Sequence, residues 1–199
     1  MKRIVFLMVS FILMTPYINA QEKKKFAVRT VAFYNVENLF DTINDPHKFD
    51  DDRTPEGADR WTSKVYNDHV HKIAKVISEI GSDVTKHAPD IVGLAEIENE
   101  AVVRDLINTE YLRKYNYGIV HYESPDARGV DVALIYKKSV FKPTASFPHS
   151  LYLTKDDGKP LYTRDQLLVS GELDGEMIHF IVNHWPSRFG GEAKSRPSR

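Results

Sequence analysis

The sequence predicts an α/β sandwich in which the sheets lie inside and the helices outside. Apolar residues recur at helical spacing over 62–80, whereas the apolar run over 90–97 is nearly continuous, as expected of a strand buried on both faces. Segments rich in β-branched and aromatic residues then dominate the rest of the chain. With 199 residues, 42% hydrophobic and 28% charged, the chain is long enough for one such domain.

The first half of the chain is predicted to begin with a strand over 30–36 that ends near Asn35. A polar segment with several prolines and glycines then predicts a long loop over 41–60. The helix over 62–80 has Thr62 or Ser63 as its N-cap and ends at Gly81.

The buried strand over 90–97 carries Glu96 near its end, and Glu98 is expected in the loop that follows. A short helix over 99–108 comes next, capped by Asn99. Asp174-Gly175 is a strong hairpin signal between the last two of the remaining strands. Those strands are predicted at 117–121, 130–136, 140–147, 163–171 and 177–184.

Residues 1–20 have the features of a signal peptide, with two basic residues, an apolar run over 4–14 and a small residue, Ala20, at the expected cleavage position. We therefore expect an exported protein, periplasmic or extracellular, with no stable membrane insertion after cleavage. An uncleaved membrane anchor is the alternative, although the apolar run is short for a membrane span.

Two features of the composition exclude classes of function. The absence of cysteine excludes disulfide frameworks, zinc fingers, iron–sulfur clusters and cysteine nucleophiles. A formal net charge of -1 argues against binding nucleic acid through a broad basic surface, so any such contact is expected to be local.

Polar side chains stand at the ends of three apolar strands. They are Asn35, Glu96 and the pair Asn183-His184. Strand ends that converge in space would bring a carboxylate, an amide and an imidazole to one cleft. Carboxylate and amide oxygens suit Mg²⁺ or Ca²⁺, and an imidazole suits a phosphate oxygen. The alternative is that these residues only begin turns.

Four segments together resemble the exonuclease–endonuclease–phosphatase superfamily. They are VAFYNVENLFD at 31–41, IVGLAEIEN at 91–99, RGVDVALIY at 128–136 and VNHWPSR at 182–188, and they occur in the order typical of the superfamily. The resemblance implies a four-layered α/β sandwich of two mixed, mainly antiparallel sheets flanked by helices. Residues 21–199 would then form the N-terminal part of such a domain, and the sandwich would be incomplete.

The resemblance also implies roles for individual residues. The catalytic group would be Asn35, Glu96 and His184, with Glu96 as the ligand of the divalent metal and Asn35 beside it. Asn183 and His184 would contact the phosphate.

The motif over 128–136 implies two further phosphate or substrate contacts. Arg128 would approach a backbone phosphate, and Asp131 belongs to the same motif. For both residues, a salt bridge that braces the loop is the alternative.

The expected function is hydrolysis of phosphodiesters with Mg²⁺, or with Mn²⁺ or Ca²⁺, by a monomeric exported endonuclease that acts on nucleic acid. Alternatives are a phosphoesterase for phospholipid or sugar-phosphate substrates and a non-catalytic phosphate-binding relative. The superfamily's G-D-x-N and S-D-H motifs are not among the 199 residues. We therefore expect a chain truncated at its C-terminus and inactive by itself.

Overall fold

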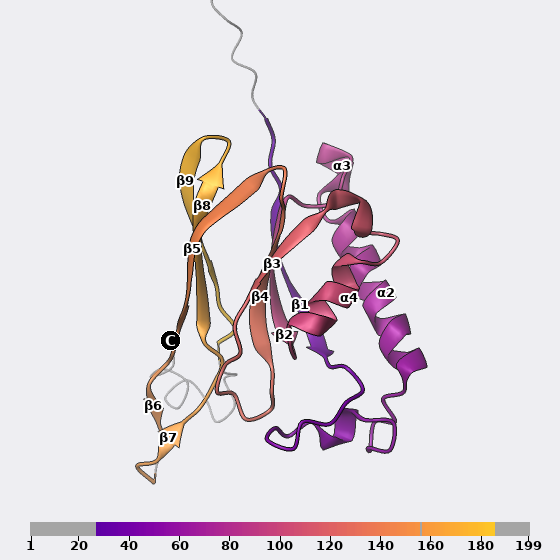
Figure 1. Cartoon of the computed structure of the whole chain (residues 1–199), viewed down its shortest axis with the longest axis vertical. Helices are drawn as coiled ribbons and strands as arrows, with labels where there is room; N and C mark the ends of the chain where they lie inside the picture. Colours follow the sequence, from indigo (N-terminus) through magenta and orange to yellow (C-terminus); the bar gives the residue numbers. More distant parts are fainter. Residues whose placement is uncertain (1–26, 156, 186–199) are drawn as a thin grey trace, which may run out of the picture.

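The computed structural model describes residues 27–155 and 157–185, which form two packed sheets with helices on one side (Figure 1). The first sheet has the strand order β1-β2-β4-β3. Strands β1 and β2 are parallel, and the other neighbours are antiparallel. The strands are β1 (Val31–Leu39), β2 (Ile91–Ile97), β3 (Tyr117–His121) and β4 (Asp131–Lys137).

The second sheet is antiparallel, with the order β5-β8-β9. Its strands are β5 (Phe141–His149), β8 (Gln166–Leu173) and β9 (Glu176–Val182). Asp174 and Gly175 join β8 to β9 with φ values of 51° and 89°. A two-residue type I′ hairpin turn requires positive φ at both positions, which explains the Asp-Gly signal.

Two helices follow the predicted signals, α2 (Ser63–Glu79) and α4 (Glu100–Ile107). The short helix α3 (Ser82–Thr85) was not predicted. Short 3₁₀ turns occur at Asp51–Arg53 and Arg113–Tyr115. The N-cap predictions are confirmed, because Thr62 accepts a hydrogen bond from Val65 N at 3.4 Å and Asn99 accepts one from Val102 N at 3.1 Å. Within the described residues, no helix has the length and apolar character needed to cross a membrane.

Helices α2 and α4 cover one face of the first sheet, and the second sheet covers the other (Figure 1). The two faces of β2 accordingly belong to two cores. Val92 and Leu94 pack in the core beneath the helices. Ile91 and Ala95 pack between the sheets with Val182 of β9. This alternation explains why the strand is apolar throughout.

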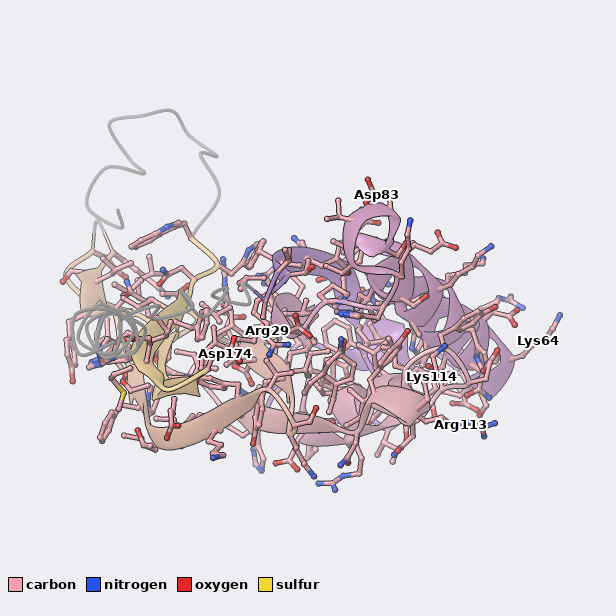
Figure 2. All side chains as sticks on the ribbon, turned by 90° about the horizontal axis from the view of Figure 1, so that it is seen from above. Arg29, Lys64, Asp83, Arg113, Lys114 and Asp174 are labelled. Carbon is pink, nitrogen blue, oxygen red and sulfur yellow. The ribbon has the colours of Figure 1, made fainter. Side chains whose placement is uncertain are left out.

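An ion pair joins the two sheets at one end of the sandwich. Arg29, just before β1, contacts Asp174 of the β8–β9 turn with 2.7 Å between Nη2 and Oδ1. The two side chains lie next to each other in the view from above (Figure 2). The carboxyl ends of β1 and β2 lie at the other end of the molecule (Figure 1).

The predicted α/β sandwich is confirmed, and it is incomplete. Helices flank only the first sheet among the described residues, and Phe147 and Ile181 of the second sheet are exposed. The sequence did not predict the small hairpin of β6 (Leu153–Thr154) and β7 (Pro160–Leu161). The predicted signal peptide lies outside the described residues.

Candidate active site

Glu96 occupies an irregularity near the end of β2. Its φ is 64°, and the register shifts at this position against both β1 and β4. In a regular strand, residue 96 would face the helices after Val92 and Leu94. Instead, Ile97 packs in that core. The bulge therefore releases the carboxylate from the core, and such backbone strain is common at functional sites.

Asn35 lies next to this bulge on the neighbouring strand, because its Cα pairs with that of Ala95. Its Oδ1 accepts a hydrogen bond from Glu37 N at 2.9 Å, and Glu37 and Asn38 both have positive φ. The predicted strand end near Asn35 is wrong, because β1 continues to Leu39 after a register shift that follows Asn35. Asn35 begins a local turn at this shift, as the alternative interpretation expected. An amide oxygen has two lone pairs, so this contact leaves one available to a ligand.

Close packing between the sheets carries His184 toward Glu96. A Cβ at Gly93 of β2 would lie 3.2 Å from both Cγ atoms of Val182, so Gly93 lets β9 approach β2 closely. His184 follows two residues later, and its Nε2 is 3.0 Å from Glu96 Oε1. The structure therefore brings Glu96 and His184 into contact, and Asn35 lies on the neighbouring strand beside the bulge.

The environment favours the neutral form of His184. Burial lowers the pKa of its imidazole, and the charges of Arg164 and Arg128 lower it further, whereas Glu96 opposes the shift. A neutral imidazole can donate its Nε2 proton to the carboxylate of Glu96. The same pKa effects show that Arg128 and Arg164 supply positive charge close to this pair.

Arg164, which the sequence analysis did not single out, holds the backbone after β9 in place. Its guanidinium donates to the carbonyl of His184 at 3.0 and 3.2 Å and to that of Trp185 at 3.1 Å. Its Nη1 also forms a buried ion pair with Asp126 Oδ2 at 3.2 Å. The available signal was an arginine at the start of a predicted strand, but its partner Asp126 is 38 residues away.

Arg128 and Asp131 are not paired with each other. Arg128 is exposed, and its Nε is 3.5 Å from Asp126 Oδ1. Asp131 is 1% exposed. Its carboxylate accepts a hydrogen bond from Ser124 N at 3.0 Å and lies 3.2 Å from His121 Nε2. The structure therefore favours the bracing role for Asp131 over substrate contact, with His121 as its partner.

The donor set at the strand ends fits a divalent cation. Glu96 supplies a carboxylate and Asn35 an amide oxygen, and Mg²⁺ commonly binds one or two carboxylates together with substrate phosphates. Asn183, adjacent to His184, has a buried Oδ1 without a hydrogen-bond partner among the described residues. Such an atom indicates a place for a polar ligand or water.

A second group of possible ligands lies at the β3 and β4 ends of the first sheet. Donor atoms of His121, Glu123 and Asp131 lie within 4.8 Å of one another. Burial raises the pKa of Glu123, as does the charge of Asp131. The carboxylate of Asp131 already contacts His121 Nε2 and accepts a hydrogen bond from Ser124 N.

A cavity of about 430 Å³ follows the ends of β1 and β2. Its charged lining residues are Asp41, Asp45, Lys48, Glu98 and Glu123. Burial raises the pKa of Glu98 to about 8, and neighbouring carboxylates add to this, although Asp41 N donates to Glu98 Oε2 at 2.6 Å. Glu98 does lie in the loop, as predicted, but it is not an inert surface residue.

Residues 30–199 match the model of the Endonuclease/Exonuclease/phosphatase family. The chain belongs to this family, which confirms the resemblance found in the sequence motifs. No curated protein matches the sequence.

Among solved structures, humanized TDP2 of D. rerio is 18% identical with a TM-score of 0.46, over 80% of this chain and 48% of that one. A family protein from Bacteroides thetaiotaomicron is 18% identical with a TM-score of 0.45, over 77% and 47%. One from Leptotrichia buccalis C-1013-b is 14% identical with a TM-score of 0.47, over 81% and 55%. The chain thus spans about half the length of these structures.

Proposed function

We propose that the protein is a divalent-metal-dependent phosphodiester hydrolase that acts on nucleic acid as an exported endonuclease. One observation carries this proposal: Glu96 Oε1 lies 3.0 Å from His184 Nε2 where the ends of β2 and β9 meet. Arg164 and Arg128 place positive charge beside the pair. A metal-ligating carboxylate next to cationic and hydrogen-bonding groups suits a phosphodiester, whose charge must be neutralised during hydrolysis.

Glu96 and Asn35 would hold the cation, with Mg²⁺ favoured over Mn²⁺ or Ca²⁺. When bound, the ion would neutralise charge on a phosphate oxygen and polarise the phosphate. Asn35 can contribute while it still accepts the hydrogen bond from Glu37 N, because its oxygen has a second lone pair.

His184 would contribute a hydrogen bond from Nε2 to a nonbridging phosphate oxygen. Its present acceptor is Glu96, so the imidazole exchanges a carboxylate oxygen for a phosphate oxygen when the substrate binds. Arg164 donates a hydrogen bond to the backbone carbonyl of His184 and so holds the backbone in place. The exchange then needs only a small movement of the imidazole. Arg128 is exposed and would approach the next phosphate along a strand by leaving Asp126, whose Oδ1 is 3.5 Å from its Nε.

Nucleic acid is the favoured substrate because Trp185, adjacent to His184, is exposed. Stacking of a base on such a ring contributes about 1–3 kcal/mol. A phospholipid head group, a sugar phosphate and binding without catalysis are the competing outcomes.

The test is hydrolysis of DNA, RNA, sphingomyelin vesicles and mannose 6-phosphate by the purified protein in its full-length form, with Mg²⁺ and with EDTA. We expect internal cleavage of nucleic acid with Mg²⁺ and none with EDTA. Preferential hydrolysis of the lipid or sugar phosphate would contradict the substrate assignment. Equal rates with EDTA would contradict the metal requirement.

Export is part of the same proposal and rests on the features of residues 1–20. N-terminal sequencing of protein recovered outside the cytoplasm should begin at or near Gln21. Recovered material that begins at Met1 would contradict cleavage. We also propose a monomer, which sedimentation equilibrium would test.

A further inference from the structure

The β6–β7 hairpin lies at the same end of the molecule as the carboxyl ends of β1 and β2 (Figure 1). Its residues line a second cavity. The cavity has a volume of about 340 Å³ and lies between the hairpin and Pro125. Pockets for small ligands start at about 300 Å³, so this one is large enough for a single ring system. The proposed hydrolysis does not use it.

The described residues that line this cavity are uncharged. Its apolar part comes from leucines, prolines and two tyrosines. Tyr152 is 95% exposed and Tyr162 is 62% exposed. Two exposed aromatic rings at the edge of a pocket whose described lining is uncharged suit a planar, neutral group, and Lys155 and Lys159 of the hairpin lie outside this lining.

Both walls of the cavity connect directly to the residues that hold His184. Pro125 immediately precedes Asp126, and Tyr162 stands two residues before Arg164. Asp126 and Arg164 form the buried ion pair at 3.2 Å, and Arg164 donates to the carbonyl of His184 at 3.0 Å. When the phosphate of a substrate contacts His184, the groups attached to that phosphate would therefore lie near this cavity.

We propose that this cavity, which we call the ring pocket, binds a nucleobase of the substrate while the phosphate lies at Glu96 and His184. The inference rests on the proposed function and adds a base-binding subsite to it. The neutral aromatic lining complements a base, and the charged groups beside it complement the phosphate. Tyr152 and Tyr162 are the residues that would stack on the base.

Two probes separate the base from the rest of the nucleotide: adenosine has no phosphate, and ribose 5-phosphate has no base. Their affinities would be measured by NMR titration of the purified protein. Replacing Tyr152 and Tyr162 together by Ala should weaken adenosine binding by about 5- to 150-fold, the range that corresponds to one stacked base. Ribose 5-phosphate should bind as before, and the double Phe variant should retain adenosine binding.

Tyr122→Ala is the matched control, because Tyr122 is an exposed tyrosine outside the ring pocket that bonds to Ser146. It should leave adenosine binding unchanged. Adenosine affinity that is equal in the wild type and the double Ala variant would overturn the proposal. An equal loss of ribose 5-phosphate affinity would also overturn it, since the pocket would then hold the sugar.

Hydrolysis of DNA with Mg²⁺ by the full-length protein and its variants separates this inference from the proposed function. Hydrolysis without adenosine binding would refute the ring pocket and leave the hydrolase assignment intact. Adenosine binding that the double Ala variant loses, without hydrolysis by the wild type, would support the pocket and refute the hydrolase.

Discussion

Replacement of Glu96 by Gln removes one negative charge from the candidate active site while keeping the side-chain volume. The folded structure should tolerate the change. The residue at position 96 has a φ of 64°, which strains Glu and Gln alike. The Gln carbonyl can still accept the hydrogen bond from His184 Nε2, so the free energy of unfolding should change by less than about 1 kcal/mol.

The effect on activity should be much larger. Among the ends of β1, β2 and β9, Glu96 offers the carboxylate that the proposal assigns to the cation, and a neutral amide is a weaker ligand for Mg²⁺. Loss of one preorganised electrostatic contact costs about 2.7–4 kcal/mol, or 10²–10³ in turnover. Loss of a metal ligand also lowers the fraction of protein with the ion bound. The rate of hydrolysis should therefore fall by at least about 10³-fold, and the affinity for the metal should decrease.

His184→Ala should separate catalysis from metal binding. The substitution removes the imidazole, but Arg164 bonds to the backbone carbonyl, which Ala retains. Metal affinity should therefore stay close to that of the wild type, while the turnover number falls by about 10²–10³.

The assay uses the full-length protein and combines calorimetric titration of Mn²⁺ and Mg²⁺ with the rate of Mg²⁺-dependent DNA cleavage. Glu79→Gln is a suitable control, because Glu79 is an exposed carboxylate at the end of α2. Glu98→Gln is a poor control, since Glu98 bonds to Asp41 N and has a raised pKa. If Glu96→Gln cleaves at the rate of Glu79→Gln, the assignment of the metal site is wrong.

Three further predictions concern the framework of the site. Arg164→Met removes the buried partner of Asp126 and leaves only the exposed Arg128 beside it, so the free energy of unfolding in urea should fall by about 3 kcal/mol. Arg29→Ala breaks an exposed pair and should cost much less. Equal losses would refute this distinction. Burial lowers the pKa of the His69 imidazole below its usual value. The neutral imidazole therefore stabilises the fold at neutral pH, and this contribution to the free energy of unfolding is lost as the pH falls through the lowered pKa. His69→Gln should make the free energy of unfolding decrease less between pH 7 and 5, and an unchanged decrease would contradict the prediction. Gly93→Ala places a methyl group 3.2 Å from the Cγ atoms of Val182 and should reduce turnover by displacing β9, which a wild-type rate would disprove.

The sequence determined the elements whose signals are local. The capped helices α2 and α4 and the turn at Asp174-Gly175 were all predicted, because caps and turns depend on a few adjacent residues. The positions of Glu96 and His184 near strand ends were also predicted, since a polar residue at the end of an apolar run can be recognised in the sequence alone. Their contact was only an expectation.

Only the tertiary structure decided how these groups meet. The bulge at Glu96 arises from register against two other strands, and the approach of His184 depends on Gly93 facing Val182 across the sheets. The pair Arg164–Asp126 and the raised pKa of Glu98 likewise depend on neighbours distant in sequence and on exclusion of water. Interactions across the fold and desolvation are properties of packing, which a local pattern of residues does not encode.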